Sequence, residues 1–183
     1  MEVGRCADCH NPHASAQDHL VKLPAGGECY DCHDDKFPDK GESAHSVISL
    51  IGCRACHEPH GGSRPALLRE DPDQLCLSCH DPGKAGVEED SPTTVLLDRF
   101  TVDTRKIRNM PSLRLSADGQ RGHPVANHRV LGTATEEELK HVETTFSGEL
   151  HCLTCHDPHK GRFDLLKWKA AGSLQACINC HPK

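Results

Sequence analysis

Residues 53–80, CRACHEPHGGSRPALLREDPDQLCLSCH, decide the fold of this 183-residue chain. The segment begins with CxxCHxPH, continues through a polar stretch to an apolar pair and a base, and ends with a second CxxCH. The same unit recurs at 6–33 and at 152–181. Because a recurring sequence unit folds as a recurring structural unit, three tandem units are expected.

All twelve cysteines of the chain lie in six CxxCH motifs. They are Cys6 and Cys9, Cys29 and Cys32, Cys53 and Cys56, Cys76 and Cys79, Cys152 and Cys155, and Cys177 and Cys180. The histidines that follow them are His10, His33, His57, His80, His156 and His181. Two thiols three residues apart can each add to one vinyl group of a haem, and the adjacent histidine then lies beneath the iron as its proximal ligand. The sequence therefore predicts six covalently bound c-type haems.

Zinc ribbons and disulfide frameworks also use paired cysteines. Cys9 to Cys29 and Cys56 to Cys76 each enclose nineteen residues, which lies within the CxxC…CxxC spacing of zinc ribbons. Neither zinc nor a disulfide requires a histidine after every CxxC, whereas haem attachment requires one at all six positions. The histidines therefore favour haem.

The composition is poor in material for a protein core, with 36% apolar and 3% aromatic residues. Folding must offset a backbone ordering cost of roughly 1 to 2 kcal/mol per residue, which so few large apolar side chains cannot do. We expect the haem faces to supply the missing core and the haem-free chain to be disordered. The expected fold class is a haem-cored multihaem cytochrome c in three tandem dihaem units.

The spacing of the motifs predicts the domain boundaries: dihaem units at 1–40, 41–82 and 119–183, with a haem-free insert at 83–118. In the long stretch between the fourth and fifth motifs, residues 95–107 alternate weakly and predict a short strand or hairpin. Thr135 and Glu138 predict a capping box for a helix that runs to about Phe146. A spacer or docking surface is favoured over a separate functional site for this region.

Six irons need six further ligands, and nine other histidines are present. Three of them lie three residues beyond a proximal histidine and are too close to reach the far face of their own haem. We expect these to ligate a neighbour, most simply the second haem of their own pair: His13, His60 and His159. For the first haem of each unit the expected ligands are His19, His45 and His123, with His128 and His141 as alternatives in the third unit and His151 as the least favoured. Met110 and Met1 would allow His/Met ligation at one or two sites at most.

The segments CADCHNPH, CRACHEPH and CLTCHDPH, each followed by a Leu-Leu-Lys-like element and a plain CxxCH, resemble the doubled-CXXCH family of multihaem cytochromes. The resemblance covers most of the chain. It implies an electron carrier of the periplasm or cell exterior, with closely packed haems and little regular secondary structure, mostly coil with a few short helices. The family's histidine ahead of each unit is matched by Gly122-His123-Pro124-Val125 and more loosely by Ala44-His45-Ser46-Val47, whereas the first unit has only five residues before Cys6.

If every iron carries two protein ligands, no coordination position is open to a substrate, so we expect an electron carrier and no enzyme. The alternatives are a repeating subunit of an extracellular filament, a haem subunit of a larger oxidoreductase complex, and an enzyme with one open haem site.

The net charge of −6 makes nucleic acid and anionic membranes poor partners and favours other redox proteins, such as cytochromes or a quinone-linked complex, alongside self-assembly. No apolar run approaches the roughly eighteen residues of a membrane span. No signal peptide is visible in this numbering, so the periplasmic or extracellular location rests on the resemblance.

Overall fold

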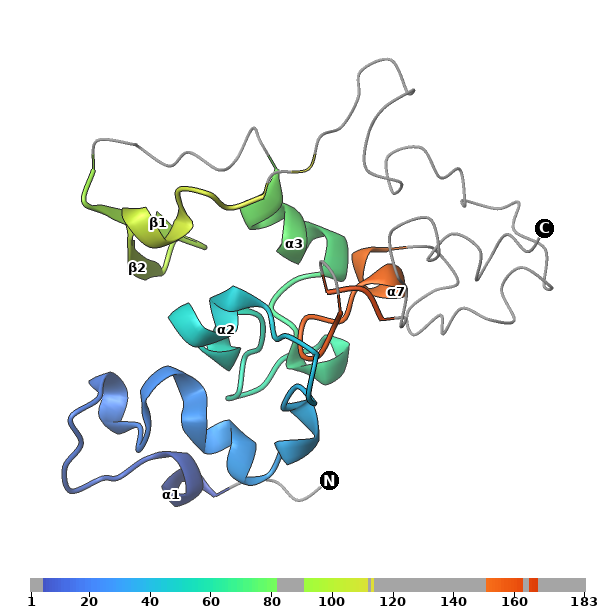
Figure 1. Ribbon diagram of the computed structural model, residues 1–183. Coiled ribbons are helices and arrows are strands. Elements are labelled where there is room, and N and C mark those ends of the chain that lie inside the picture. Colours follow the sequence, from blue (N-terminus) through green and yellow to red (C-terminus); the bar gives the residue numbers. More distant parts are fainter. Residues whose placement is uncertain (1–4, 82–90, 112, 114–150, 163–164, 168–183) are drawn as a thin grey trace, which may run out of the picture.

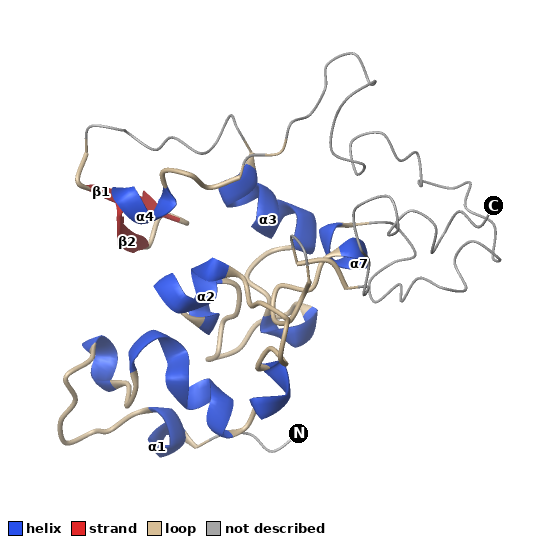
Figure 2. Ribbon diagram, in the orientation of Figure 1, coloured by secondary structure: helices blue, strands red, loops and turns tan. Residues whose placement is uncertain are grey.

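A computed structural model describes residues 5–81, 91–111, 113, 151–162 and 165–167 of the chain (Figure 1). Within them the regular structure consists of short helical segments and one two-stranded sheet joined by loops (Figure 2). This agrees with the expectation of a mostly coil chain with a few short helices. The expected helix from Thr135 to Phe146 lies outside the described residues.

The described CxxC motifs each fold as a helical turn. The turns are α1 (Cys6–Cys9), the end of the 3-10 helix η2 (Pro24–Asp31), η4 (Cys53–Ala55), the end of α3 (Pro72–His80), and α7 (Cys152–Cys155). A helical turn places residues three apart on one face, as attachment of both thiols to one haem requires. In four of the motifs the backbone N–H of the proximal histidine donates to the carbonyl of the first cysteine at 2.9 or 3.0 Å: His10, His33, His57 and His156.

The apolar pair of each unit returns to the first motif of that unit. Backbone bridges join His10 to Val21, His57 to Leu68, and His156 to Leu166. The basic residue that follows the pair makes the same backbone hydrogen bond in all three units. The N–H groups of Lys22, Arg69 and Lys167 donate to the carbonyl of the last cysteine of their motif at 2.9, 2.9 and 3.0 Å. The three units therefore share one backbone pattern.

The residues before the apolar pairs form two further 3-10 turns, η1 (Asp18–Leu20) and η5 (Pro65–Leu67), and η3 (Asp34–Lys36) follows the second motif. Helix α2 (Ser46–Leu50) begins after His45, whose ring Nδ1 accepts the N–H of Val47 at 3.1 Å. No helix in the described part of the chain is long and apolar enough to span a membrane.

The expected strand or hairpin at 95–107 is confirmed. Strands β1 (Thr93–Leu96) and β2 (Phe100–Asp103) pair antiparallel, with Leu96 opposite Phe100. Helix α4 (Thr104–Ile107) follows directly, and the Asp103 carboxylate caps it by accepting the N–H of Arg105 at 2.9 Å.

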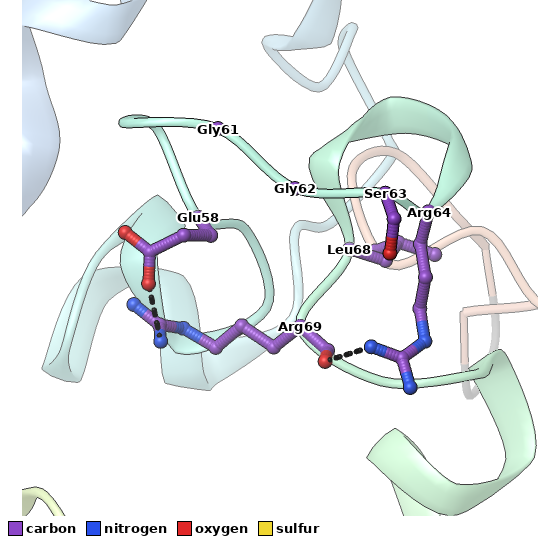
Figure 3. A pocket seen from close by; sticks show the side chains of 7 residues that line it. All are labelled: Glu58, Gly61, Gly62, Ser63, Arg64, Leu68 and Arg69. Carbon is purple, nitrogen blue, oxygen red and sulfur yellow. Dashed lines mark hydrogen bonds and ion pairs between the residues drawn. The ribbon is translucent and has the colours of Figure 1, made fainter.

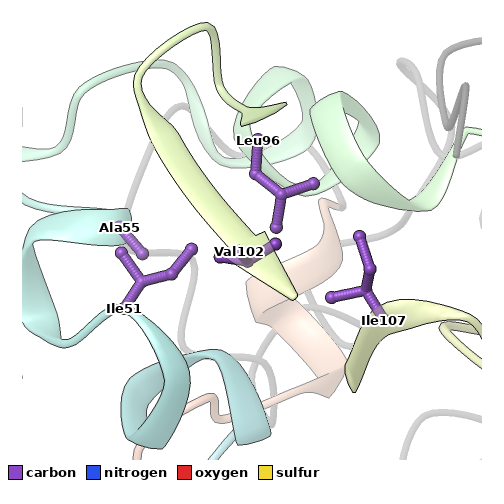
Figure 4. Packing of buried hydrophobic residues seen from close by; sticks show 5 residues of the cluster. All are labelled: Ile51, Ala55, Leu96, Val102 and Ile107. Carbon is purple, nitrogen blue, oxygen red and sulfur yellow. The ribbon is translucent and has the colours of Figure 1, made fainter. Parts of the chain in front are cut away.

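The hairpin is packed on the second unit. Leu96, Val102 and Ile107 form a buried cluster with Ile51 and Ala55 (Figure 4). This cluster holds most of the buried apolar side chains of the described residues, the others being Val21 and Leu68. Such a small core agrees with the composition, which leaves most of the apolar surface to be supplied from elsewhere.

The second and third units are joined through their backbones. Ser43 and Gly161 exchange two hydrogen bonds, of 2.9 and 3.1 Å, and the N–H of His45 donates to the carbonyl of Pro158 at 2.8 Å. A second link runs from the N–H of Cys152 to the Asp73 carboxylate at 2.8 Å, which holds α7 beside α3 (Figure 1). The described part of the third unit is thus attached to the second at two places.

Candidate functional site

Three proximal histidines donate a hydrogen bond from Nδ1 to a backbone carbonyl. The acceptors are His19 for His10 at 2.9 Å, Ala66 for His57 at 2.7 Å, and Pro111 for His80 at 2.5 Å. A carbonyl oxygen can only accept, so the proton of these rings lies on Nδ1. The lone pair is then on Nε2, which is the nitrogen a haem iron needs.

Left-handed backbone turns present two of these carbonyls. His19 and Leu20 have φ of 58° and 57°, and Ala66 and Leu67 have φ of 53° and 56°. Two consecutive left-handed residues without glycine are costly, which indicates that the surrounding bonds impose the turn. This role could not be read from the sequence, because nothing in an apolar pair marks the residue before it as one whose carbonyl accepts a hydrogen bond from a histidine ring.

In the first two units the two members of the apolar pair differ in burial. Val21 and Leu68 are both 8% exposed, whereas Leu20 and Leu67 are 43% and 39% exposed. The buried member forms the bridge to the proximal histidine, and the exposed member lies in the left-handed turn. That the pair covers a haem face remains a prediction.

Three pairs of histidine rings lie at the separation that one bound metal ion requires. The centroids of His10 and His60 are 5.8 Å apart, those of His57 and His159 are 6.0 Å apart, and those of His45 and His80 are 5.7 Å apart. Two imidazoles that bind the same metal ion from opposite sides, each through a nitrogen about 2 Å from it, have ring centroids roughly 6 Å apart. Every pair combines a proximal histidine with a candidate distal one, so the residues present fit a haem iron.

The pairs correct the expected partners. His60 was expected beside the second motif of its own unit, but its ring lies beside His10 of the first unit. His159 likewise lies beside His57 of the preceding unit. The ring of His45, expected at the first haem of the second unit, lies beside His80 of the second haem.

The reason is the backbone stagger between units. Because the loop of His159 is bonded to residues 43–45, it is held beside the second unit. His19 is corrected as well: its carbonyl, and not its ring, meets His10.

The xPH turn sets the position of these distal candidates. In the third unit the Asp157 carboxylate accepts the N–H of His159 at 2.8 Å, and in the first unit the Asn11 side chain accepts that of His13 at 3.2 Å. Such Asx turns, with proline in the middle, fix the direction of the chain two residues on.

In the second unit the turn is held by Glu58. Its carboxylate pairs with Arg69 at 2.8 Å, beside a shallow pocket of about 200 Å³ whose lining includes Gly61 and Gly62, which follow His60 (Figure 3). Arg69 also donates from Nε to the carbonyl of Arg54 at 2.7 Å. Arg69 therefore ties the His60 turn to the third motif.

Burial lowers the pKa of His45 and of His159. The neighbouring His80 lowers the pKa of His45 further, and nearby charges have smaller effects on the pKa of His159. A lowered pKa keeps an imidazole neutral at pH 7, the state in which it can bind a metal. His45 differs in tautomer, because its Nδ1 accepts a backbone N–H. Binding of an iron through Nε2 by neutral His45 requires the ring to release this helix cap.

The thiols of consecutive motifs lie close enough to affect one another. A hydrogen bond between Cys29 and Cys53 raises the pKa of Cys29 and lowers that of Cys53 to about 7. A hydrogen bond between Cys76 and Cys152 lowers the pKa of Cys76 and raises that of Cys152. Burial, followed by the charges of Cys76 and Cys79, raises the pKa of Cys56 to about 11. The second motif thus adjoins the third, the third the fourth, and the fourth the fifth.

Several predicted site residues are not placed against a ring. Within the described residues, neither His13 nor His33 contacts another imidazole, and both are exposed. Five further predicted site residues, and the alternative His141, lie outside the described residues: His123, His128, Cys177, Cys180 and His181.

Paired CxxC turns, each followed by an oriented histidine, are the features of multihaem c-type cytochromes. Residues 1–37, 45–85 and 146–183 match the family model described as the doubled CXXCH motif, and together these segments cover more than half of the chain. The chain belongs to the doubled CXXCH motif family. Neither the curated proteins nor the solved structures gave a match.

The family match confirms the expected resemblance and the three tandem paired units. It supports a multihaem c-type cytochrome that takes part in electron transfer, and it favours a carrier over an enzyme.

Proposed function

We propose that this chain is a hexahaem c-type cytochrome that carries electrons along closely spaced, mostly bis-histidine haems in the periplasm or outside the cell. The observation that carries the proposal is the spacing of three histidine pairs, each with ring centroids 5.7 to 6.0 Å apart. Bound haem supplies one-electron redox chemistry, which the side chains of the protein lack.

In this proposal the protein holds three of the irons from both sides. His10 and His60 bind the first haem, His57 and His159 the third, and His80 and His45 the fourth. Backbone carbonyls fix the tautomer of His10, His57 and His80, which also raises the basicity of each ligand. With both axial positions filled, no site is left for a substrate, which supports a carrier and not an enzyme.

The order of electron transfer follows the chain. Hydrogen bonds between the thiols of Cys29 and Cys53, and between those of Cys76 and Cys152, bring motifs of successive units together. Haems attached to adjoining turns are close, so electrons would pass along the motifs in sequence order. Other redox proteins, such as cytochromes or a quinone-linked complex, would be the partners at the two ends.

The test is the intact mass of holoprotein made in a host with haem-maturation machinery, together with ligand binding. Six attached haems and no binding of CO by the reduced protein are expected. Fewer than six haems would contradict the count. Stoichiometric CO binding would contradict full ligation and favour an enzyme with an open haem site.

A second candidate, assembly of copies through shared ligands, is favoured by His13. His60 and His159 each lie beside the first proximal histidine of the preceding unit. His13 occupies the equivalent position in the first unit and is exposed. In this second proposal it ligates a haem of another copy, in a head-to-tail contact that does not close. Filaments in negative-stain images that disappear in His13→Ala would support it, whereas a monomer at micromolar concentration would exclude it.

A further inference from the structure

In the first and third motifs a returning apolar pair helps to orient the proximal histidine, and the fourth motif is arranged differently. After the first and third motifs, an apolar pair of the same unit returns and a carbonyl nine residues on accepts the Nδ1 proton of His10 or His57. His80 has a different partner. Its Nδ1 donates to the carbonyl of Pro111, at 2.5 Å, and its own carbonyl accepts the N–H of Leu113 at 2.8 Å. Pro111 and Leu113, from a distant part of the chain, therefore take the place of a returning pair.

The hairpin that precedes Pro111 in the chain also packs against α2, the helix that follows His45. Val102 and Ile107 are each 6% exposed and pack with Ile51, at the end of α2. Val47 and Leu50 of α2 also border this cluster. Helix α2 begins after His45, the histidine whose ring lies 5.7 Å from that of His80. One folded segment thus contacts the helix next to one candidate ligand and hydrogen-bonds the other.

Polar contacts hold the hairpin in this place. Arg99 pairs with Glu58 at 3.4 Å, and the guanidinium of Arg69 lies over the ring of Phe100 at 6.0 Å. The N–H of Met110 donates to the carbonyl of Ile107 at 2.9 Å, which leads the chain from α4 to Pro111. The position of the Pro111 carbonyl therefore depends on the packing of the hairpin.

The site held in this way differs from the other two pairs. The rings of His45 and His80 make an angle of 68°, whereas both other pairs make 22°. Because neutral His45 must release its helix cap to bind an iron, this angle describes the site before the ring has moved. A carbonyl at Nδ1 makes the proximal ligand more basic, which stabilises the ferric state and lowers the reduction potential.

We propose that residues 91–111, together with Leu113, are a positioning element for the fourth haem, which orients His80 through the Pro111 carbonyl. The inference rests on the proposed function, because it takes these two histidines as ligands. It gives the haem-free insert a role in tuning one cofactor, in place of the expected spacer or docking surface.

The experiment compares two substitutions of the same type in the same hairpin. Val102→Asp places a charge in the buried cluster, whereas Val95→Asp changes a residue that is 58% exposed. Both holoproteins are checked for six haems by intact mass, and then examined by EPR and by potentiometric titration. In Val102→Asp one low-spin signal should shift and one midpoint potential should rise, with the other signals unchanged. Val95→Asp should match the wild type.

The inference is overturned if Val102→Asp leaves every EPR signal and every potential unchanged, or if Val95→Asp has the same effect. Should Val102→Asp fail to mature, Ile107→Ala truncates the same cluster more mildly and carries the same expectation and the same contrary outcome. Failure of the proposed function would be visible in the wild type itself, as missing haems or as high-spin iron. The two failures are therefore distinguishable.

Discussion

The imidazole ring of His159, in the third unit, lies 6.0 Å from that of His57, in the second, with 22° between the ring planes. His60 stands in the same relation to His10, one unit earlier. The histidine of each later xPH turn thus lies beside the first proximal histidine of the unit before it.

Removal of a ligand donated across units should open a haem in the preceding unit. In His159→Ala, the third haem is expected to become high-spin when reduced and to bind about one CO per chain, because the empty axial position is accessible. Absorbance spectra of the reduced protein with CO measure this. His60→Ala should do the same at the first haem.

His19→Ala is the matched control for these variants. Only the carbonyl of His19 contacts His10, and alanine already stands at the equivalent position as Ala66. The variant should therefore bind no CO. If His19→Ala opened a haem and His159→Ala did not, the assignment of ligands across units would be wrong.

Gly161 should tolerate no side chain. A Cβ at this position would lie 2.3 Å from the backbone of Leu165, whereas one at Gly62, the equivalent residue of the second unit, would meet only the Leu67 Cα at 4.0 Å. We expect Gly161→Ala to cost roughly 1 to 3 kcal/mol of stability by overpacking, and to displace the loop that carries His159.

Thermal unfolding of the two holoproteins, followed in the Soret band, compares these glycine variants. Gly62→Ala should unfold close to the wild type. Equal midpoints for both variants would show that the close approach of Gly161 to Leu165 does not constrain the loop.

Arg69 should matter more than Arg99, although both pair with Glu58. Arg69 is the more buried and binds Glu58 at 2.8 Å and the Arg54 carbonyl at 2.7 Å, whereas Arg99 lies 3.4 Å from Glu58. Arg69→Ala leaves the Arg54 carbonyl without this partner and should cost about 1 to 3 kcal/mol. Arg99→Ala should cost less than about 1 kcal/mol, as exposed pairs do. Denaturant unfolding of each holoprotein provides the comparison, and similar costs would contradict it.

The reactivity of the thiols tests whether the haem-free chain is disordered. In the folded arrangement Cys53 has a pKa of about 7 and Cys56 one of about 11, so alkylation at neutral pH would strongly favour Cys53. A disordered chain removes both environments, so we expect similar rates at the two thiols, measured by peptide mass spectrometry. A large excess at Cys53 would show that the fold forms before haem is attached.

The repeat and the hairpin could be predicted from the sequence because both have local causes. A CxxCH turn needs only five residues, and the alternation at 95–107 is visible within one segment. The partners of His60 and His45 could not be predicted, because they depend on how units are staggered, and that follows from backbone bonds such as those between Ser43 and Gly161. Equally, no residue type marks Pro111 as the acceptor for His80, since every residue has a carbonyl.

In the proposed ligation, the donation of ligands to earlier units would give biogenesis a direction. A chain exported from its N-terminus would present Cys6 and Cys9 for haem attachment before His60 has emerged. His10 would then lack its partner until the next unit is translocated and folded against it. Each newly matured unit would therefore complete a site in the one before it.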